Sequence, residues 1–255
     1  MKIPSYRASG DIIIYNLGDL HRGHQGFNYE LWLKILDAIK SEPNAFWVTT
    51  GDLFEVALIG SKGDPYGSMA PESEFYALAK ELAPIAHKCL GGVDSNHHAR
   101  FEKASGMSMD RLFYGELGIR EKFLGDFGLI RVICGEAPYH ICMHHGNGGG
   151  ATRGAAVNNL QKLSNIFSGA DLYMEGHTHM FDNFVDEMFY IDKKRGNWVR
   201  YNAHFVTTGH MIDYMKSYAA KKKYKPSSMG VSRTVLSAAA VGRMDKKRIR
   251  TELFY

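Results

Sequence analysis

Short apolar runs and amphipathic segments alternate along the first two thirds of the chain. Apolar runs at 11–17 and 45–50 predict buried strands, and the segment between them, 28–40, carries apolar residues at helical spacing. A strand, a helix and a second strand in this order form a βαβ unit with parallel strands. The alternation continues with predicted helices at about 72–86 and 156–168, a further helix ahead of residue 128, and strands at 88–93, 128–135, 139–144 and 171–176.

After residue 183 the pattern changes to strands. Runs at 183–191 and 199–210 are rich in β-forming residues, a short helix follows, and runs at 232–241 and 248–255 close the chain. No repeat, linker or low-complexity block interrupts the sequence. The pattern therefore predicts one α/β domain over residues 1–255, in which two packed sheets are flanked by helices and the active loops lie at strand ends.

Composition narrows the class of protein. The chain has 255 residues, of which 45% are hydrophobic, and this is enough to bury one sizeable core. Its net charge of +4 comes mainly from the C-terminal third, which is compatible with an anionic substrate. Because no window approaches the roughly 18 apolar residues of a membrane span and no signal-peptide core is present, we expect a cytoplasmic protein without a membrane partner. Cys89, Cys134 and Cys142 lie in apolar runs and are expected to be reduced core residues.

Polar residues that can bind metal ions follow five of the predicted strands. Each group comes at the end of an apolar run, where a sheet would bring the groups to a common edge. Asp, Asn and His are ligands of hard-to-borderline divalent cations, so these groups predict a joint metal site. They are Asp19 and His21, then Asp52, then Asn96, His97 and His98, then His144 and His145, and finally His177 and His179.

In chain order these groups read D-x-H, G-D, N-H, H-H-G and G-H-x-H, an order that resembles the calcineurin-like metallophosphoesterase superfamily. The resemblance covers about residues 11–210, and the loop "HHGNGGG" at 144–150 is similar to that of small phage and bacterial members. It implies an α/β fold, a four-layer α/β/β/α sandwich of two mixed sheets. It also implies two divalent metal ions, with Mn²⁺ as the leading candidate and Fe or Zn as alternatives.

The resemblance further implies a ligand set for the two metal ions. Three residues would hold each ion, and Asp52 would bridge the ions because a carboxylate has two oxygens to share. His144 directly ends its strand and is therefore preferred over His145 in the second group. The first group is Asp19, His21 and His179, and the second group is Asn96, His144 and His177.

Catalytic and substrate-binding roles complete the predicted site. By resemblance, a hydroxide that bridges the ions would attack phosphorus in line, and His97 would protonate the leaving oxygen as the general acid. Basic and loop residues next to the metal-binding groups are expected to contact phosphate, although each arginine could instead be a solvated charge. These substrate-binding candidates are Arg22, Arg100, His145, Asn147, Gly148 and Arg153.

One motif departs from the family pattern. The family usually has G-N-H followed by an acid that orients the histidine, whereas this chain has Ser95 in place of the glycine and His98 in place of the acid. Either Asp94 or another acid then orients His97, or this histidine is less well positioned than in typical members. Asn96 has an alternative role as the cap of a helix that begins near His98.

Together these features predict a metal-dependent phosphoesterase. The preferred activity is that of a phosphodiesterase or nuclease acting on DNA, RNA or nucleotides. A phosphomonoesterase for proteins or small molecules is the first alternative, and a non-catalytic binding module on the same fold is the second. All seven expected ligand positions carry residues able to bind a metal ion, which favours an enzyme, since a scaffold is free to lose its ligands. The sequence leaves the oligomeric state open.

Overall fold

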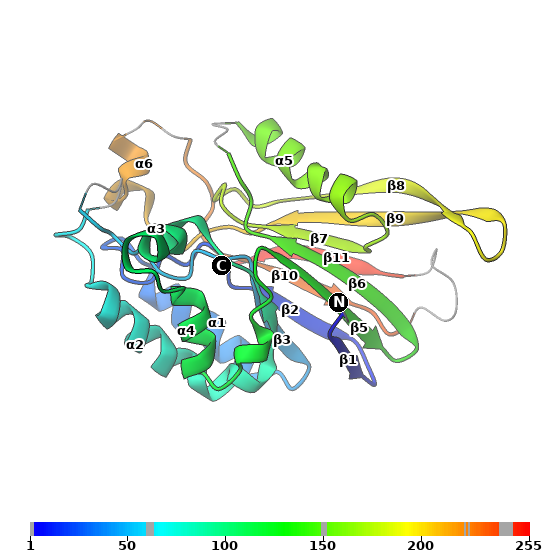
Figure 1. Cartoon of the computed structure of the whole chain (residues 1–255), viewed down its shortest axis with the longest axis horizontal. Coiled ribbons are helices and arrows are strands. Elements are labelled where there is room, and N and C mark those ends of the chain that lie inside the picture. The colour runs from blue at the N-terminus through cyan, green and yellow to red at the C-terminus, as the bar shows by residue number, and fades with distance from the viewer. Residues whose placement is uncertain (1–2, 60–63, 149–151, 222, 224, 240–246) are drawn as a thin grey trace.

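The computed structural model describes residues 3–59, 64–148, 152–221, 223, 225–239 and 247–255. These residues form two mixed β-sheets that pack face to face, with helices on the outer face of each sheet (Figure 1). This order of layers confirms the four-layer α/β/β/α sandwich that the sequence implies.

The first sheet contains the predicted βαβ unit. In spatial order it consists of β11 (Ile249–Phe254), β10 (Val231–Leu236), β2 (Ile12–Asn16), β3 (Ala45–Thr49) and β4 (Cys89–Gly92). The strands β2, β3 and β4 are parallel, whereas β10 pairs antiparallel with both β2 and β11. The carboxyl ends of the three parallel strands therefore lie at one edge of the sheet.

The second sheet is also mixed. Its strands in spatial order are β1 (Ser5–Ala8), β5 (Phe127–Cys134), β6 (Ala137–His144), β7 (Leu172–Glu175), β9 (Asn197–Thr207) and β8 (Asp182–Asp192). The strands β6, β7 and β9 are parallel, so their carboxyl ends also share an edge. The pattern of the sequence does not predict β1, because its four residues alternate between exposed and half-buried and form no apolar run.

Helices make up the two outer layers and the connections. They are α1 (Tyr29–Ser41), α2 (Pro71–Leu82), α3 (Asn96–Ser105), α4 (Met109–Glu116), α5 (Arg153–Ile166) and α6 (Tyr218–Lys221), with short 3-10 helices at Ala83–Lys88, Arg120–Lys122 and Tyr214–Lys216. The single helix predicted ahead of residue 128 is in fact α3 and α4. They are separate because Gly106, with φ of 73°, ends α3 and Ser108 caps the start of α4.

Three apolar cores separate the four layers. In β2, Ile13 and Tyr15 face α1, α2 and α4, whereas Ile12 and Ile14 pack between the two sheets. Because both faces of this strand are buried, it has no polar side and its sequence is a continuous apolar run. The third core lies between α5 and the outer face of the second sheet, where Leu160 packs near residues of β6, β7 and β9.

Cys89, Cys134 and Cys142 are buried and form no disulfide, as expected. Within the described ranges, every helix is too short or too polar to cross a membrane.

Candidate metal centre

The predicted metal-binding groups converge where the strand-end edges of the two sheets meet. Asp19 and His21 follow β2, Asp52 follows β3, and Asn96 begins α3 just after β4. The loops after β6 and β7 approach from the second sheet and carry the remaining histidines. The loops of the two sheets are joined directly, since the backbone N–H of His177 donates to Oδ1 of Asp19 at 3.0 Å.

Asp19, His21 and His179 form the first cluster of possible metal ligands, and their donor atoms all lie within 4.8 Å of one another. The Nδ1–H of His21 donates to Oε2 of Glu55 at 3.0 Å, so the Nε2 of His21 presents a lone pair to the cluster. This Nε2 lies 3.0 Å from the Nε2 of His179. Because two lone pairs at this distance repel each other, a proton or a cation must lie between or beside the two nitrogens.

Asp52, His145 and His177 form the second cluster, again with donor atoms within 4.8 Å of one another. The side-chain oxygen of Asn96 lies 3.3 Å from Nε2 of His145 and belongs to the same group. The Nδ1–H of His145 donates to the carbonyl of Thr50 at 2.7 Å, and the Nε2–H of His177 donates to that of Gly148 at 3.1 Å. These bonds leave the other nitrogen of each ring as a lone pair that faces the cluster.

The carboxylate of Asp52 lies between the two clusters. Its Oδ2 is 3.3 Å from Nε2 of His145 on one side and 3.9 Å from Nε2 of His21 on the other. No other described carboxylate belongs to a ligand group on both sides. This is the position that a bridging ligand requires.

The structure places His145, and not His144, among the donor atoms, which corrects our preferred choice for the second group. Consecutive residues at the end of a strand face opposite sides. His144 therefore packs against Phe127, with ring centroids 4.7 Å apart, and its Nδ1 accepts the backbone N–H of Gly146 at 2.8 Å. The nearest acid to its ring is Glu175, at 3.8 Å. His145 is thus the ligand candidate and is no longer only a substrate-binding candidate.

The polar groups of the site fit divalent cations. Oδ2 of Asp19 is buried and has no hydrogen-bond partner among the described residues. Burial raises the pKa of Asp19 to about 8. Although burial opposes the shift, the Asp52 carboxylate raises the pKa of His145 to about 9. Divalent cations would balance the charge of the buried carboxylates and accept the lone pairs of the histidine nitrogens. The mixed oxygen and nitrogen donors suit Mn²⁺, Fe or Zn.

His97 forms a third group of possible metal ligands with His21 and Asp52, and the donor atoms of this group also lie within 4.8 Å of one another. Its backbone N–H donates to Oδ1 of Asp52 at 3.2 Å, and its Nε2 is 3.8 Å from Oδ2 of the same residue. The Nδ1–H of its ring donates to the backbone carbonyl of Glu55 at 2.9 Å. A backbone carbonyl thus holds the ring of His97 at Nδ1, in the place where the first of the two alternatives expects Asp94 or another acid.

His98 does not lie beside His97 as the orienting acid of the family would, and Asn96 does not cap a helix. His98 turns into the interior, where its Nδ1 lies 2.5 Å from Oδ2 of Asp110 and its Nε2 accepts the backbone N–H of Phe54 at 3.3 Å. Ser95, and not Asn96, is the N-cap of α3. The amide of Asn96 is thereby free to face the second cluster.

Glu55 is a site residue that the sequence motifs do not single out. Its carboxylate holds His21 and its backbone carbonyl holds His97. The only signal was an acid three positions after Asp52. His210 is a second such residue, since its buried ring stacks on that of His179 with centroids 5.2 Å apart.

Arg22 and Arg100, the two arginines predicted to bind substrate in the first half of the chain, both lie near acidic residues. Arg22 forms an ion pair with Glu81 at 2.9 Å and covers the rings of Phe27 and Tyr29, so its charge is already satisfied away from the clusters. Arg100 is half-buried in α3. Burial raises the pKa of Glu55, and the positive charge of Arg100 partly opposes this rise.

The loop after β6 and the start of α5 hold the remaining candidates. Gly148 meets the site through its carbonyl, whereas the carbonyl of Asn147 accepts from the side chain of Asn159 at 3.0 Å. Arg153 lies at the start of α5 with its Nε 3.5 Å from Asp182. Residues 149 and 150 of the glycine-rich loop are outside the described residues.

The sequence matches no family model, and no curated protein matches it. Solved structures with a similar fold include a conserved uncharacterized protein from Streptococcus pneumoniae TIGR4, described as a predicted phosphoesterase. It shares 10% identity at a TM-score of 0.40, with 96% of this chain and 100% of that chain covered. They also include the calcineurin-like phosphoesterase YfkN from Bacillus subtilis, with 11% identity, a TM-score of 0.41 and coverage of 97% and 92%.

Proposed function

We propose that this chain is a phosphoesterase that uses two divalent metal ions and hydrolyses phosphodiesters, with nucleic acids or nucleotides as its substrates. The placement of Asp52 supports this most strongly, because its carboxylate lies between two clusters of metal-binding side chains. A non-catalytic binding module has no need to keep such an arrangement complete.

Four side chains would hold each ion, with Asp52 common to both. When bound, two such ions polarise the phosphoryl group and lower the pKa of a water molecule enough for attack near neutral pH. We take Mn²⁺ as the first metal to test, followed by Fe and Zn. The first ion would be held by Asp19, His21, Asp52 and His179, and the second by Asp52, Asn96, His145 and His177.

His97 is the proposed proton donor to the leaving oxygen. Its Nδ1–H is fixed on the carbonyl of Glu55, so Nε2 is the ring atom that faces the clusters and can carry the transferable proton. The bond from its backbone N–H to Asp52 keeps the donor in a constant position relative to the bridging carboxylate. Positioned general acids of this kind contribute about 10²- to 10⁴-fold to rate.

Hydrolysis assays with matched esters test this function. We expect chelated protein to be inactive, and added Mn²⁺ to restore hydrolysis of bis(p-nitrophenyl) phosphate more strongly than that of p-nitrophenyl phosphate. A faster monoester would replace the diester assignment with a phosphomonoesterase. If no ester is hydrolysed with Mn²⁺, Fe²⁺ or Zn²⁺, the enzyme assignment is wrong.

The variant Asp52→Asn tests the shared ligand. It keeps the size of the side chain but removes the negative charge between the clusters, so we expect loss of at least one metal ion and of activity by about 10³-fold or more. Metal content is measured by mass spectrometry of the dialysed protein. The control Asp37→Asn changes an exposed acid of α1 and should behave as wild type. Near-normal turnover of Asp52→Asn with two ions bound would contradict the dinuclear model.

A further inference from the structure

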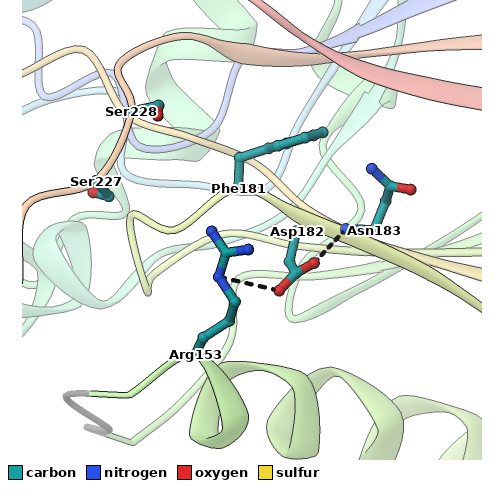
Figure 2. Close-up of a pocket in the computed structure, with 6 residues that line it drawn as sticks. All are labelled: Arg153, Phe181, Asp182, Asn183, Ser227 and Ser228. Atoms are coloured by element: carbon teal, nitrogen blue, oxygen red, sulfur yellow. Dashed lines mark hydrogen bonds and ion pairs between the residues drawn. The ribbon is translucent and has the colours of Figure 1, made fainter.

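A groove lies between the start of α5, the start of β8 and the segment 225–228. Two adjoining cavities of about 230 and 310 Å³ form it, and both are lined by Arg153, Ser227 and Ser228. Figure 2 shows Arg153 extending from α5 toward Phe181 and Asp182, with the two serines on the other side. We call this the Arg153 groove.

The Arg153 groove adjoins the metal centre. Residues 180–183 line it and directly follow His179, a ligand candidate of the first cluster. On its other side, the hydroxyl of Ser227 lies 3.0 Å from Nε2 of His210, whose ring stacks on that of His179. One wall of the groove therefore continues along the chain from His179. The other wall reaches His179 through Ser227 and His210.

The groups that face the groove suit a phosphate group. The side chain of Arg153 is 64% exposed and contacts Asp182 through Nε at 3.5 Å, and its two terminal nitrogens have no hydrogen-bond partner among the described residues. Lys225 is exposed and adds a second positive charge, and Ser227 and Ser228 add hydroxyl groups. The one acid, Asp182, is already engaged by Arg153 and by the backbone N–H of Asn183.

We propose that the Arg153 groove binds a second phosphate group of the substrate, next to the phosphate that is hydrolysed. The inference rests on the proposed function and names its substrate class: esters with more than one phosphate, such as a nucleic-acid strand or a nucleoside polyphosphate. Arg153 is the specificity-determining residue, because its free guanidinium nitrogens can donate two hydrogen bonds to one phosphate. A single-phosphate ester cannot use the groove.

Binding in the absence of hydrolysis tests the groove directly. The probe is a short 5′-fluorescein-labelled oligothymidylate, measured by fluorescence anisotropy with the full chain in excess EDTA. We expect Arg153→Ala to raise Kd about five- to tenfold and to reduce the salt dependence by about one charge. Arg195→Ala is the matched control, since Arg195 is an exposed arginine of the β8–β9 turn, 3.8 Å from Asp192. Unlabelled trinucleotide or a nucleoside triphosphate should displace the probe, and the better competitor identifies the preferred phosphate source.

Several results would overturn the proposal. These are no binding by wild type, equal effects of Arg153→Ala and Arg195→Ala, or no displacement by either competitor. In Mn²⁺-loaded protein, Arg153→Ala should raise KM for the oligonucleotide more than for bis(p-nitrophenyl) phosphate, and equal losses on both would place Arg153 at the reacting phosphate instead. Failure of all hydrolysis would refute the proposed function, while the EDTA measurement still decides whether the groove binds phosphate.

Discussion

Several residues of the candidate metal centre have a backbone conformation in the left-handed region. Non-glycine residues in the left-handed region cost about 1–3 kcal/mol each, so they persist only where surrounding contacts hold them. Here the loops hold one another: the backbone N–H of Asp19 donates to the carbonyl of Gly51, and that of His21 to the carbonyl of Asp52, both at 3.0 Å. The site residues with positive φ are Asp19 (52°), His21 (49°), Asp52 (49°), His177 (68°) and His179 (56°).

At this scale the first prediction separates the adjacent histidines after β6. We expect His145→Ala to lower the occupancy of one metal ion, because its Nε2 lies among the donor atoms of the second cluster. His144→Ala is the matched control and should retain both ions, since its ring packs against Phe127. Calorimetric titration of metal-free protein with Mn²⁺ measures the number of sites. Two sites in His145→Ala and one in His144→Ala would restore His144 as the ligand.

The second prediction concerns His97 as general acid. A proton matters most when the leaving group is a sugar hydroxyl and least when it is a nitrophenolate, which departs unaided. We therefore expect His97→Ala to retain both metal ions, to lose about 10²- to 10⁴-fold on a nucleotide diester, and to lose far less on bis(p-nitrophenyl) phosphate. Steady-state kinetics on both substrates, with metal analysis, provide the measurement. Equal losses together with a missing ion would show that His97 is a ligand.

At the scale of elements, the loop after β3 depends on helices that lie far along the chain. This loop carries both Asp52 and Glu55. The side chain of Glu74 in α2 holds its backbone. The two carboxylate oxygens of Glu74 accept the backbone N–H groups of Glu55 at 2.8 Å and of Val56 at 3.1 Å. His98 of α3 accepts a third N–H of this loop. The helices thus position the bridging ligand as well as covering the sheet.

Glu74→Gln tests this support. The amide has one acceptor oxygen where the carboxylate has two, so one buried N–H would face an NH₂ group and lose its partner. We expect the free energy of unfolding to fall by about 1–3 kcal/mol, and the hydrolytic rate to fall because Asp52 is less firmly held. Urea denaturation and ester hydrolysis measure the two effects, and Glu72→Gln, an exposed position of the same helix, is the control. Unchanged stability and rate would show that the loop does not need Glu74.

At the scale of the whole molecule, the two sheets are joined at both ends. The loops of the candidate metal centre join them at the carboxyl ends of the parallel strands. At the opposite end of β7, Nζ of Lys247 donates to Oδ1 of Asp171 at 2.7 Å, and both side chains are almost fully buried. Lys247 leads into β11 of the first sheet and Asp171 leads into β7 of the second. Although burial opposes it, hydrogen bonds from His140 and Lys247 and the positive charge of Lys247 lower the pKa of Asp171.

Lys247→Met should destabilise the sandwich without altering the metal centre. Without Lys247, the buried carboxylate keeps only its contacts with His140, so we expect a loss of about 1–3 kcal/mol and a fall in Tm of about 3–10 °C. Because the folded-state pKa of Asp171 is lowered, its contribution is present at neutral pH and is lost as pH falls below about 4. The difference in Tm between wild type and variant should therefore shrink in acid. Lys34→Met, which breaks only an exposed pair with Glu30, is the control for thermal melts.

Local sequence was sufficient for most of the order of elements and for the choice of most residues that the structure brings together as possible metal ligands. Apolar runs and helical spacing depend on neighbouring positions, so they predicted the βαβ start, the long helices and the strands of both sheets except β1. Asp, Asn and His directly after apolar runs predicted a joint site, because parallel strands deliver their carboxyl ends to one edge. The substrate and the identity of the metal stay predictions.

Only the tertiary structure decided which way individual side chains point and which distant partners hold them. The choice between His144 and His145 depends on which face of β6 packs against the other sheet, and one residue along a strand reverses that direction. The roles of Glu55 and His98 depend on where the loop after β3 meets α2, α3 and α4. Asp19 and His177 are 158 positions apart yet hydrogen-bonded. Contacts at such separations are set by how whole layers pack, because periodicity in a sequence records which residues are buried and does not record what they are buried against.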